Sequence, residues 1–150
     1  MTSPSIQPIV KEVVVGVDAV SAFALFTDRV AQWWPVDLHS VDGSAGQGLR
    51  FDERGFVETL SNGRETEWGA IRVWDPPHRL LFTWHPGAAA ELHTLLEITF
   101  TPAPAWTLVR LAHTGWETLP LPRQSGRANY VTGWDFVLGR YVQLTREAWE

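Results

Sequence analysis

Residues 74–84, WDPPHRLLFTW, decide the fold class of this 150-residue chain. Pro76 and Pro77 have no backbone N–H, and a proline pushes the residue before it toward extended geometry, so a helix is excluded here. After the prolines, the large apolar residues Leu80, Phe82 and Trp84 alternate with other residues. Such alternation is typical of a strand with one face toward an interior. The segment therefore predicts a strand end, a tight turn and a second strand.

Further strands are predicted on both sides of this segment, over 56–60, 64–74, 79–85, 91–101 and 106–113. The Asn62-Gly63 pair is a strong signal for a two-residue hairpin between the first two of these. Gly69 interrupts a strand and predicts a bulge or a close backbone approach. Connections this short, with no helix between strands, require antiparallel pairing.

Helices are predicted only outside this run of strands. A strand over 9–16 comes first, and Asp18 then stands at a helix N-cap position. The helix behind it has the apolar stripe Val20, Phe23, Ala24 and Thr27, and a second short helix over 29–33 ends at Pro35. A long helix starts near 123 or 125 and continues to 149. Its stripe is Tyr130, Trp134, Val137, Tyr141, Leu144 and Ala148, widened by Val131, Leu138 and Val142.

This order of elements predicts an α+β fold in one domain over residues 1–150, with a core over about 9–149. A strand is followed by two short helices, an antiparallel meander and a long C-terminal helix. An amphipathic sheet must cover one face, and only the long helix is large enough to do so. Gly133 and Gly139 weaken that helix, and we expect close approach to the sheet to compensate. A curved sheet that holds one helix leaves a space between them for a ligand.

Composition excludes several classes of function. The chain has no cysteine, so thiolate chemistry, disulfides and cysteine metal sites are excluded. Its net charge is −5, with eleven arginines, one lysine and no basic run, which argues against nucleic-acid binding. No signal peptide and no apolar run of about 20 residues is present, so the sequence predicts no membrane partner and a cytoplasmic location. No histidine spacing suits zinc, and no motif predicts a cofactor.

The motifs together resemble those of the SRPBCC superfamily, which has the START/Bet v 1-like helix-grip fold. Within it, the chain is similar to the branch named for the activator of heat-shock-protein-90 ATPase homologue. The residues that carry this resemblance are 23–28, Trp33-Trp34-Pro35, Trp68-Gly69, Trp74-Asp75-Pro76-Pro77, 79–84, His113-Thr114-Gly115-Trp116 and Gly133-Trp134. The resemblance implies a hydrophobic cavity between sheet and C-terminal helix, which relatives use for lipids, sterols and polyketides. It does not imply ATPase activation, because the additional N-terminal domain of the eukaryotic co-chaperone has no counterpart here.

The cavity that this resemblance implies has a predicted set of lining residues. They are Trp33, Trp34, Phe82, Trp84, Leu96, Val109, Leu111, His113, Trp116, Tyr130, Trp134, Val137 and Tyr141. Adjacent residues on one helical turn point about 100° apart, so Trp33 and Trp34 must have different roles. The alternative is that the nine tryptophans fill the space between sheet and helix completely.

His113 is the best polar candidate in this set. Arg110 is expected to face water, which places Thr107, Val109, Leu111 and His113 on the inward face of their strand. His113 could then orient a ligand or act as a base, or it could be a structural histidine with both nitrogens satisfied. Glu58, Glu65 and Glu67 flank the predicted hairpin and are either a solvated edge or a source of one buried acid.

Three functions follow from these residues. The first is non-enzymatic binding of a small apolar or aromatic molecule. The second is a cyclase, hydrolase or lyase that pairs His113 with a carboxylate. The third is a protein-interaction module, such as a chaperone partner or a homodimer through the outer sheet face.

Overall fold

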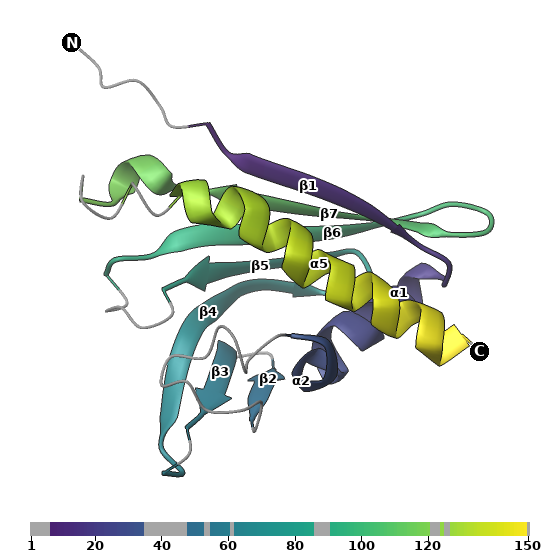
Figure 1. Ribbon diagram of the computed structural model, residues 1–150, viewed down its shortest axis with the longest axis horizontal. Helices are drawn as coiled ribbons and strands as arrows, with labels where there is room; N and C mark the ends of the chain where they lie inside the picture. Colours follow the sequence, from purple (N-terminus) through teal and green to yellow (C-terminus); the bar gives the residue numbers. More distant parts are fainter. Residues whose placement is uncertain are drawn as a thin grey trace.

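A seven-stranded antiparallel sheet forms the framework of the computed structural model (Figure 1). The structure describes residues 7–34, 48–52, 55–60, 62–85, 91–120, 124 and 127–149. The strands are β1 Ile9–Val15, β2 Leu49–Phe51, β3 Gly55–Thr59, β4 Glu65–Asp75, β5 Arg79–Trp84, β6 Thr94–Pro102 and β7 Thr107–Thr114.

The strand order across the sheet is β1-β7-β6-β5-β4-β3-β2. Strands β2 to β7 therefore form a meander in which each strand pairs with the next, as short connections dictate. The first strand breaks this order, because β1 lies beside β7, with Ile9 opposite His113 and Val15 opposite Thr107. The chain between β1 and β2 must cross from one edge of the sheet to the other. The predicted α+β helix-grip architecture is confirmed.

The turn between β4 and β5 lies where the prolines predict it. The Pro76–Pro77 peptide bond is cis, and the N–H of His78 donates to the carbonyl of Asp75 at 2.8 Å. The hairpin at Asn62-Gly63 is confirmed, but its loop is longer than the predicted two residues, because the strands close at Leu60, whose N–H donates to the Arg64 carbonyl at 2.7 Å. Gly63 has a φ of 86°, which favours glycine.

The strand after the prolines has the predicted inward face. Leu80, Phe82 and Trp84 are all buried. Thr83 and His85, on the opposite face, are buried too, which alternation alone does not predict. The hydroxyl of Thr83 accepts a hydrogen bond from the N–H of Ala70 at 2.7 Å, so β4 lies against this side chain.

Two short helices follow β1, as predicted: α1 Ala19–Asp28 and α2 Val30–Trp33. Asp18 caps α1, and its carboxylate accepts from the N–H of Ser21 at 2.7 Å. This hydrogen bond lowers the pKa of Asp18. The predicted apolar stripe is confirmed for Phe23 and Thr27, which are buried, but it is wrong for Val20, which is 67% exposed. The face toward the core is formed by Ala19, Ala22, Phe23, Phe26 and Thr27. Pro35 lies outside the described residues.

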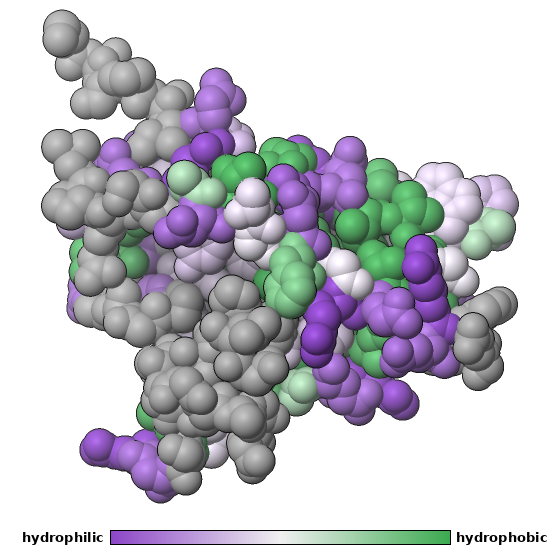
Figure 2. Space-filling view, viewed as in Figure 1, coloured by the Kyte–Doolittle hydropathy of each residue, from purple (hydrophilic) through white to green (hydrophobic). Residues whose placement is uncertain are grey.

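The long helix α5 Arg127–Trp149 crosses one face of the curved sheet, with α1 and α2 beside its C-terminal half (Figure 1). Trp134, Val137, Leu138, Tyr141 and Leu144 are buried, which confirms the central part of the predicted stripe. Figure 2 shows hydrophilic residues over much of the C-terminal half of α5 and hydrophobic residues beside it, along β1. Among the described residues, no helix is long and apolar enough to cross a membrane.

The expected reason for the glycines in α5 is wrong. A Cβ on Gly133 or on Gly139 would meet no atom within 4 Å, so neither glycine is required by close approach to the sheet. Gly139→Ala is therefore expected to raise the free energy of unfolding by up to about 1 kcal/mol, because alanine loses less backbone entropy in a helix. Urea unfolding followed by circular dichroism measures this change. A decrease in stability would show that this face of α5 is covered by a neighbour.

Candidate functional site

An aromatic cluster occupies the space where α5 faces the sheet. Its members are Trp34, Phe56, Trp68, Trp84, His113, Trp116, Tyr130 and Trp134, and ring contacts join them into one group. They come from the end of α2, from β3, β4, β5 and β7, from the short 3-10 helix Trp116–Thr118, and from α5. The sheet and α5 therefore meet through aromatic rings, which bury large areas and pair in preferred edge-to-face or offset geometry.

Trp34 lies in the middle of this cluster. Its ring centroid is 5.4 Å from that of Phe56 and 5.8 Å from those of Trp68, Trp84 and Trp134. Its side chain follows α2, so one residue after a short helix contacts both the sheet and α5. The Trp34 ring therefore contacts rings of the sheet and a ring of α5 at the same time.

The other indole N–H groups of the cluster all have acceptors. Trp68 donates to Glu58 Oε1 at 3.2 Å, and Trp84 donates to the Tyr130 hydroxyl at 3.0 Å. Trp134 donates to His113 Nδ1 at 3.0 Å, and Trp116 donates to the backbone carbonyl of His113 at 3.2 Å. These bonds fix four of the rings in place, since a buried donor that loses its acceptor costs about 1–3 kcal/mol.

The indole nitrogen of Trp34 is the exception. Among the described residues it is the one buried side-chain nitrogen or oxygen without a hydrogen-bond partner. Trp34 is only 7% exposed, so its N–H is withdrawn from water without compensation. The centre of the aromatic cluster therefore holds an unsatisfied buried donor.

His113 is held as a neutral histidine. Its Nδ1 accepts from Trp134, so the ring proton lies on Nε2 and donates to Thr94 Oγ1 at 2.6 Å. The Thr94 hydroxyl in turn donates to the Trp84 carbonyl at 3.4 Å. Burial, with a smaller effect of the charge of Arg127, lowers the pKa of His113 to about 3. Both ring nitrogens are occupied, which is the arrangement of a structural histidine.

This geometry gives no support to a His113–carboxylate pair. In the described part of the chain, the hydrogen-bond partners of the imidazole are Thr94 and Trp134, and neither is an acid. No group of three or more metal-ligating side chains is found among the described residues.

Three residues beside the site were not among the predicted lining residues. Phe56, Glu58 and Trp68 come from β3 and β4, where the curled sheet brings them beside Trp34 and Trp84. Glu58 is 1% exposed, so of the three glutamates near the hairpin it is the buried one. Phe56 and Glu58 are two residues apart along β3, so they lie on the same face of the strand. This spacing was the signal that could have placed both on the inward face.

The predicted lining residues divide into three groups in the structure. Six of them lie in the aromatic cluster: Trp34, Trp84, His113, Trp116, Tyr130 and Trp134. Two pack against Phe26, Trp33 at 5.0 Å and Tyr141 at 5.2 Å between ring centroids, and the Trp33 ring also contacts Trp34 at 5.4 Å. Five are buried core residues: Phe82, Leu96, Val109, Leu111 and Val137. Of the two tyrosine hydroxyls, that of Tyr141 donates to the Ala22 carbonyl at 2.7 Å, and burial raises its pKa.

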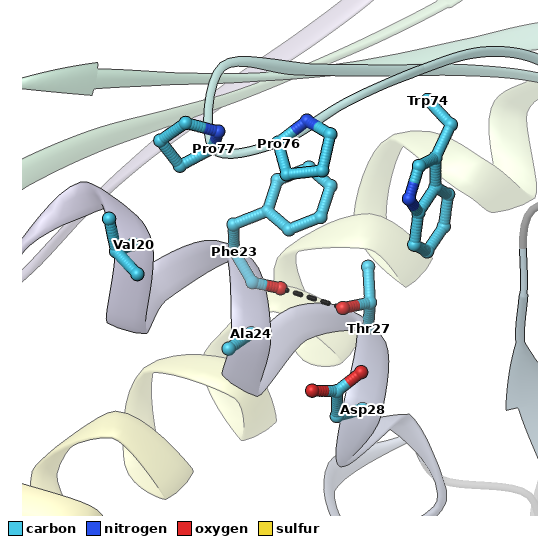
Figure 3. A pocket seen from close by; sticks show the side chains of 8 residues that line it. All are labelled: Val20, Phe23, Ala24, Thr27, Asp28, Trp74, Pro76 and Pro77. Atoms are coloured by element: carbon cyan, nitrogen blue, oxygen red, sulfur yellow. Dashed lines mark hydrogen bonds between the residues drawn. The ribbon is translucent and has the colours of Figure 1, made fainter.

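A separate hollow lies beside α1 (Figure 3). It measures about 320 Å³ and lies between α1 and the connection from β4 to β5. Its walls are Val20, Phe23, Ala24, Thr27, Asp28, Trp74, Pro76 and Pro77. The WDPP motif therefore forms one wall of a pocket as well as a turn.

Solved structures share this fold over nearly the whole chain. CalC from Micromonospora echinospora, described as a self-sacrificing resistance protein, is 23% identical with a TM-score of 0.72, and the match covers 94% of this chain and 95% of CalC. MLL2253 from Mesorhizobium loti is 16% identical with a TM-score of 0.65, over 94% and 98% of the two chains. Txn09, described as an anthrahydroquino-γ-pyrone synthase and solved in complex with SUM, is 28% identical with a TM-score of 0.58, over 93% and 97%.

The sequence itself decides the family. No curated protein sequence matches the chain. Residues 17–142 match the family described as Activator of Hsp90 ATPase homolog 1-like protein. This match covers most of the chain and includes α1, the meander and most of α5, so the chain belongs to that family, the branch of the SRPBCC superfamily that its motifs resemble.

Proposed function

We propose that the protein binds a small planar aromatic molecule bearing a hydrogen-bond acceptor, and that the ligand enters the aromatic cluster between the sheet and α5. The observation that carries this proposal is the buried, unpaired N–H of Trp34. An acceptor on the ligand would satisfy this donor and recover its desolvation cost. The surrounding rings supply the apolar walls that small-molecule sites need.

Trp34 is also the ring that can move at the lowest cost in hydrogen bonds. Protein interiors are close-packed, so a ligand must separate rings that are in contact. Moving Trp68, Trp84, Trp116 or Trp134 breaks an indole hydrogen bond, whereas moving Trp34 breaks none among the described residues. We infer that Trp34 gives way and that its N–H then meets the ligand.

The nature of the ligand is supported by one structural relative. Txn09 is described as a synthase of an anthrahydroquino-γ-pyrone, a name that denotes fused rings with oxygen substituents, and it is 28% identical to this chain. Fused aromatic rings match a cluster built from indoles and phenyl rings, and their oxygens match the donor of Trp34. Of the predicted lining residues, Trp34, Trp84, Tyr130 and Trp134 would contact such a molecule.

A matched pair of probes tests the proposal. Fluorenone and fluorene share one ring skeleton, but only fluorenone carries a carbonyl acceptor. Isothermal titration calorimetry is expected to show that fluorenone binds up to about tenfold more tightly, since one net hydrogen bond contributes about 0.5–1.5 kcal/mol. Trp34→Phe keeps an aromatic ring and removes the N–H, so the two affinities should become equal.

Trp33→Phe is the control for this experiment. It alters a buried indole that contacts the Trp34 ring at 5.4 Å between centroids, but whose own N–H already donates to the Phe26 carbonyl at 3.3 Å. The preference for fluorenone should persist in this variant. Equal binding of both probes to the unmodified protein, absence of binding by either, or loss of the preference in Trp33→Phe would each contradict the proposal.

A further inference from the structure

The hollow between α1 and the β4–β5 connection has features of a second binding site. Its volume of about 320 Å³ lies at the lower end of the range for small-molecule pockets. It lies outside the aromatic cluster, and none of its eight lining residues belongs to that cluster. Whatever binds there is recognised by a different set of groups.

The walls of this hollow are apolar and aromatic. Phe23 and Trp74 stand edge to face with centroids 5.6 Å apart, and Pro76 and Pro77 lie beside them (Figure 3). Val20 adds an apolar side chain that is 67% exposed. Aromatic faces carry partial negative charge and attract cations, most strongly when the ring is an indole.

One lining residue is ionisable, and it is an acid. Asp28 is the last residue of α1, and Figure 3 shows its carboxylate beside Thr27, across from Trp74. In the described part of the chain Asp28 has no hydrogen bond or ion pair, and the Thr27 hydroxyl donates to the Phe23 carbonyl at 2.9 Å. The carboxylate is therefore free to pair with a ligand.

We propose that this hollow binds an organic ammonium ion with a small apolar body. The apolar part would pack on Val20, Pro76 and Pro77. The ammonium group would lie between the Trp74 ring and the Asp28 carboxylate, which combines a cation–π contact with an ion pair. The chain's net charge of −5 favours a cation over an anion of the same shape.

Three probes of similar size and different charge test this second site: benzylammonium, benzyl alcohol and phenylacetate. Two-dimensional ¹H–¹⁵N NMR titrations of the full chain report both affinity and place, because each indole N–H gives its own signal. Benzylammonium is expected to bind about tenfold more tightly than benzyl alcohol, from the sum of a cation–π contact and an exposed ion pair. Its shifts should fall on Trp74 and on the backbone of residues 23–28.

Asp28→Asn should weaken benzylammonium binding about threefold, because it removes the ion pair and leaves the cation–π contact with Trp74. Glu117→Gln is the matched control, since it removes the same charge from an exposed residue of the 3-10 helix, away from the hollow, and it should leave the affinity unchanged. Equal binding of the three probes, unchanged affinity in Asp28→Asn, or shifts centred on the Trp34 indole would overturn the proposal. Because these readouts are separate from the fluorenone preference, either proposal can fail without the other.

Discussion

Gly69→Ala is expected to lower the free energy of unfolding by about 3 kcal/mol or more. A Cβ on Gly69 would lie 1.7 Å from the backbone carbonyl oxygen of Thr83 and 2.8 Å from its carbonyl carbon. Backbone atoms in a paired strand cannot give way as a flexible side chain can, so β4 and β5 would have to separate. Overpacking of this kind typically costs about 1–3 kcal/mol and occasionally more.

The measurement for Gly69→Ala is urea unfolding followed by tryptophan fluorescence. Gly139→Ala is the matched control, because the same substitution there meets no atom within 4 Å. The effect should also reach the aromatic cluster. Gly69 follows Trp68, where the β3–β4 register shifts, and the Trp68 indole bonds to Glu58. A Gly69→Ala variant as stable as the unmodified protein would show that β4 and β5 are not held this closely.

The strands could be predicted because their signals are local. Leu80, Phe82 and Trp84 alternate along one short segment, and the two prolines before them exclude a helix without reference to the rest of the chain. The same period places Thr107 and His113 on the inward face of β7, and both are buried. The close approach at Gly69 is also a local signal, because a glycine inside a strand often marks a bulge or a nearby backbone.

The face of α1 could not be fixed in this way. A stripe through Val20, Phe23 and Thr27 and one through Ala19, Phe23 and Phe26 have similar helical spacing, and Phe23 belongs to both. Valine gives a stronger apolar signal than alanine, but packing against the sheet selects the face that contains Ala19 and Ala22. Val20 is left at the surface, where it lines the second hollow.

The polar pattern of the site depends on three-dimensional packing that the sequence does not reveal. All nine tryptophans look alike in the sequence, yet among the cluster indoles only that of Trp34 lacks an acceptor. Glu58 lies near two other glutamates in the sequence, and only the curl of β3 and β4 buries it against Trp68. Whether a buried donor is satisfied depends on shifts of about an ångström or less in neighbouring rings, which no periodicity encodes.

Acidification is expected to destabilise the protein through His113. The pKa of this imidazole is about 3 in the folded chain and 6.5 in a solvated one, so the unfolded state binds a proton first as pH falls. The stabilisation is therefore complete above about pH 6.5 and is lost progressively between about pH 6.5 and pH 3. Between pH 7 and pH 5, His113 alone should lower the free energy of unfolding by about 2 kcal/mol.

The change in the free energy of unfolding with pH, rather than its value at one pH, identifies His113 as the cause. His113→Asn removes the titrating ring. Between pH 7 and pH 5, the free energy of unfolding of this variant should fall by about 2 kcal/mol less than that of the unmodified protein. The variant is expected to be less stable at pH 7, because the Trp134 N–H and the Thr94 hydroxyl lose their fitted partner. His78→Asn changes an exposed histidine and should keep the original slope. If both variants keep the pH dependence of the unmodified protein, His113 is charged or solvated in the folded protein. The neutral imidazole between Thr94 and Trp134 is then not the form that stabilises the cluster.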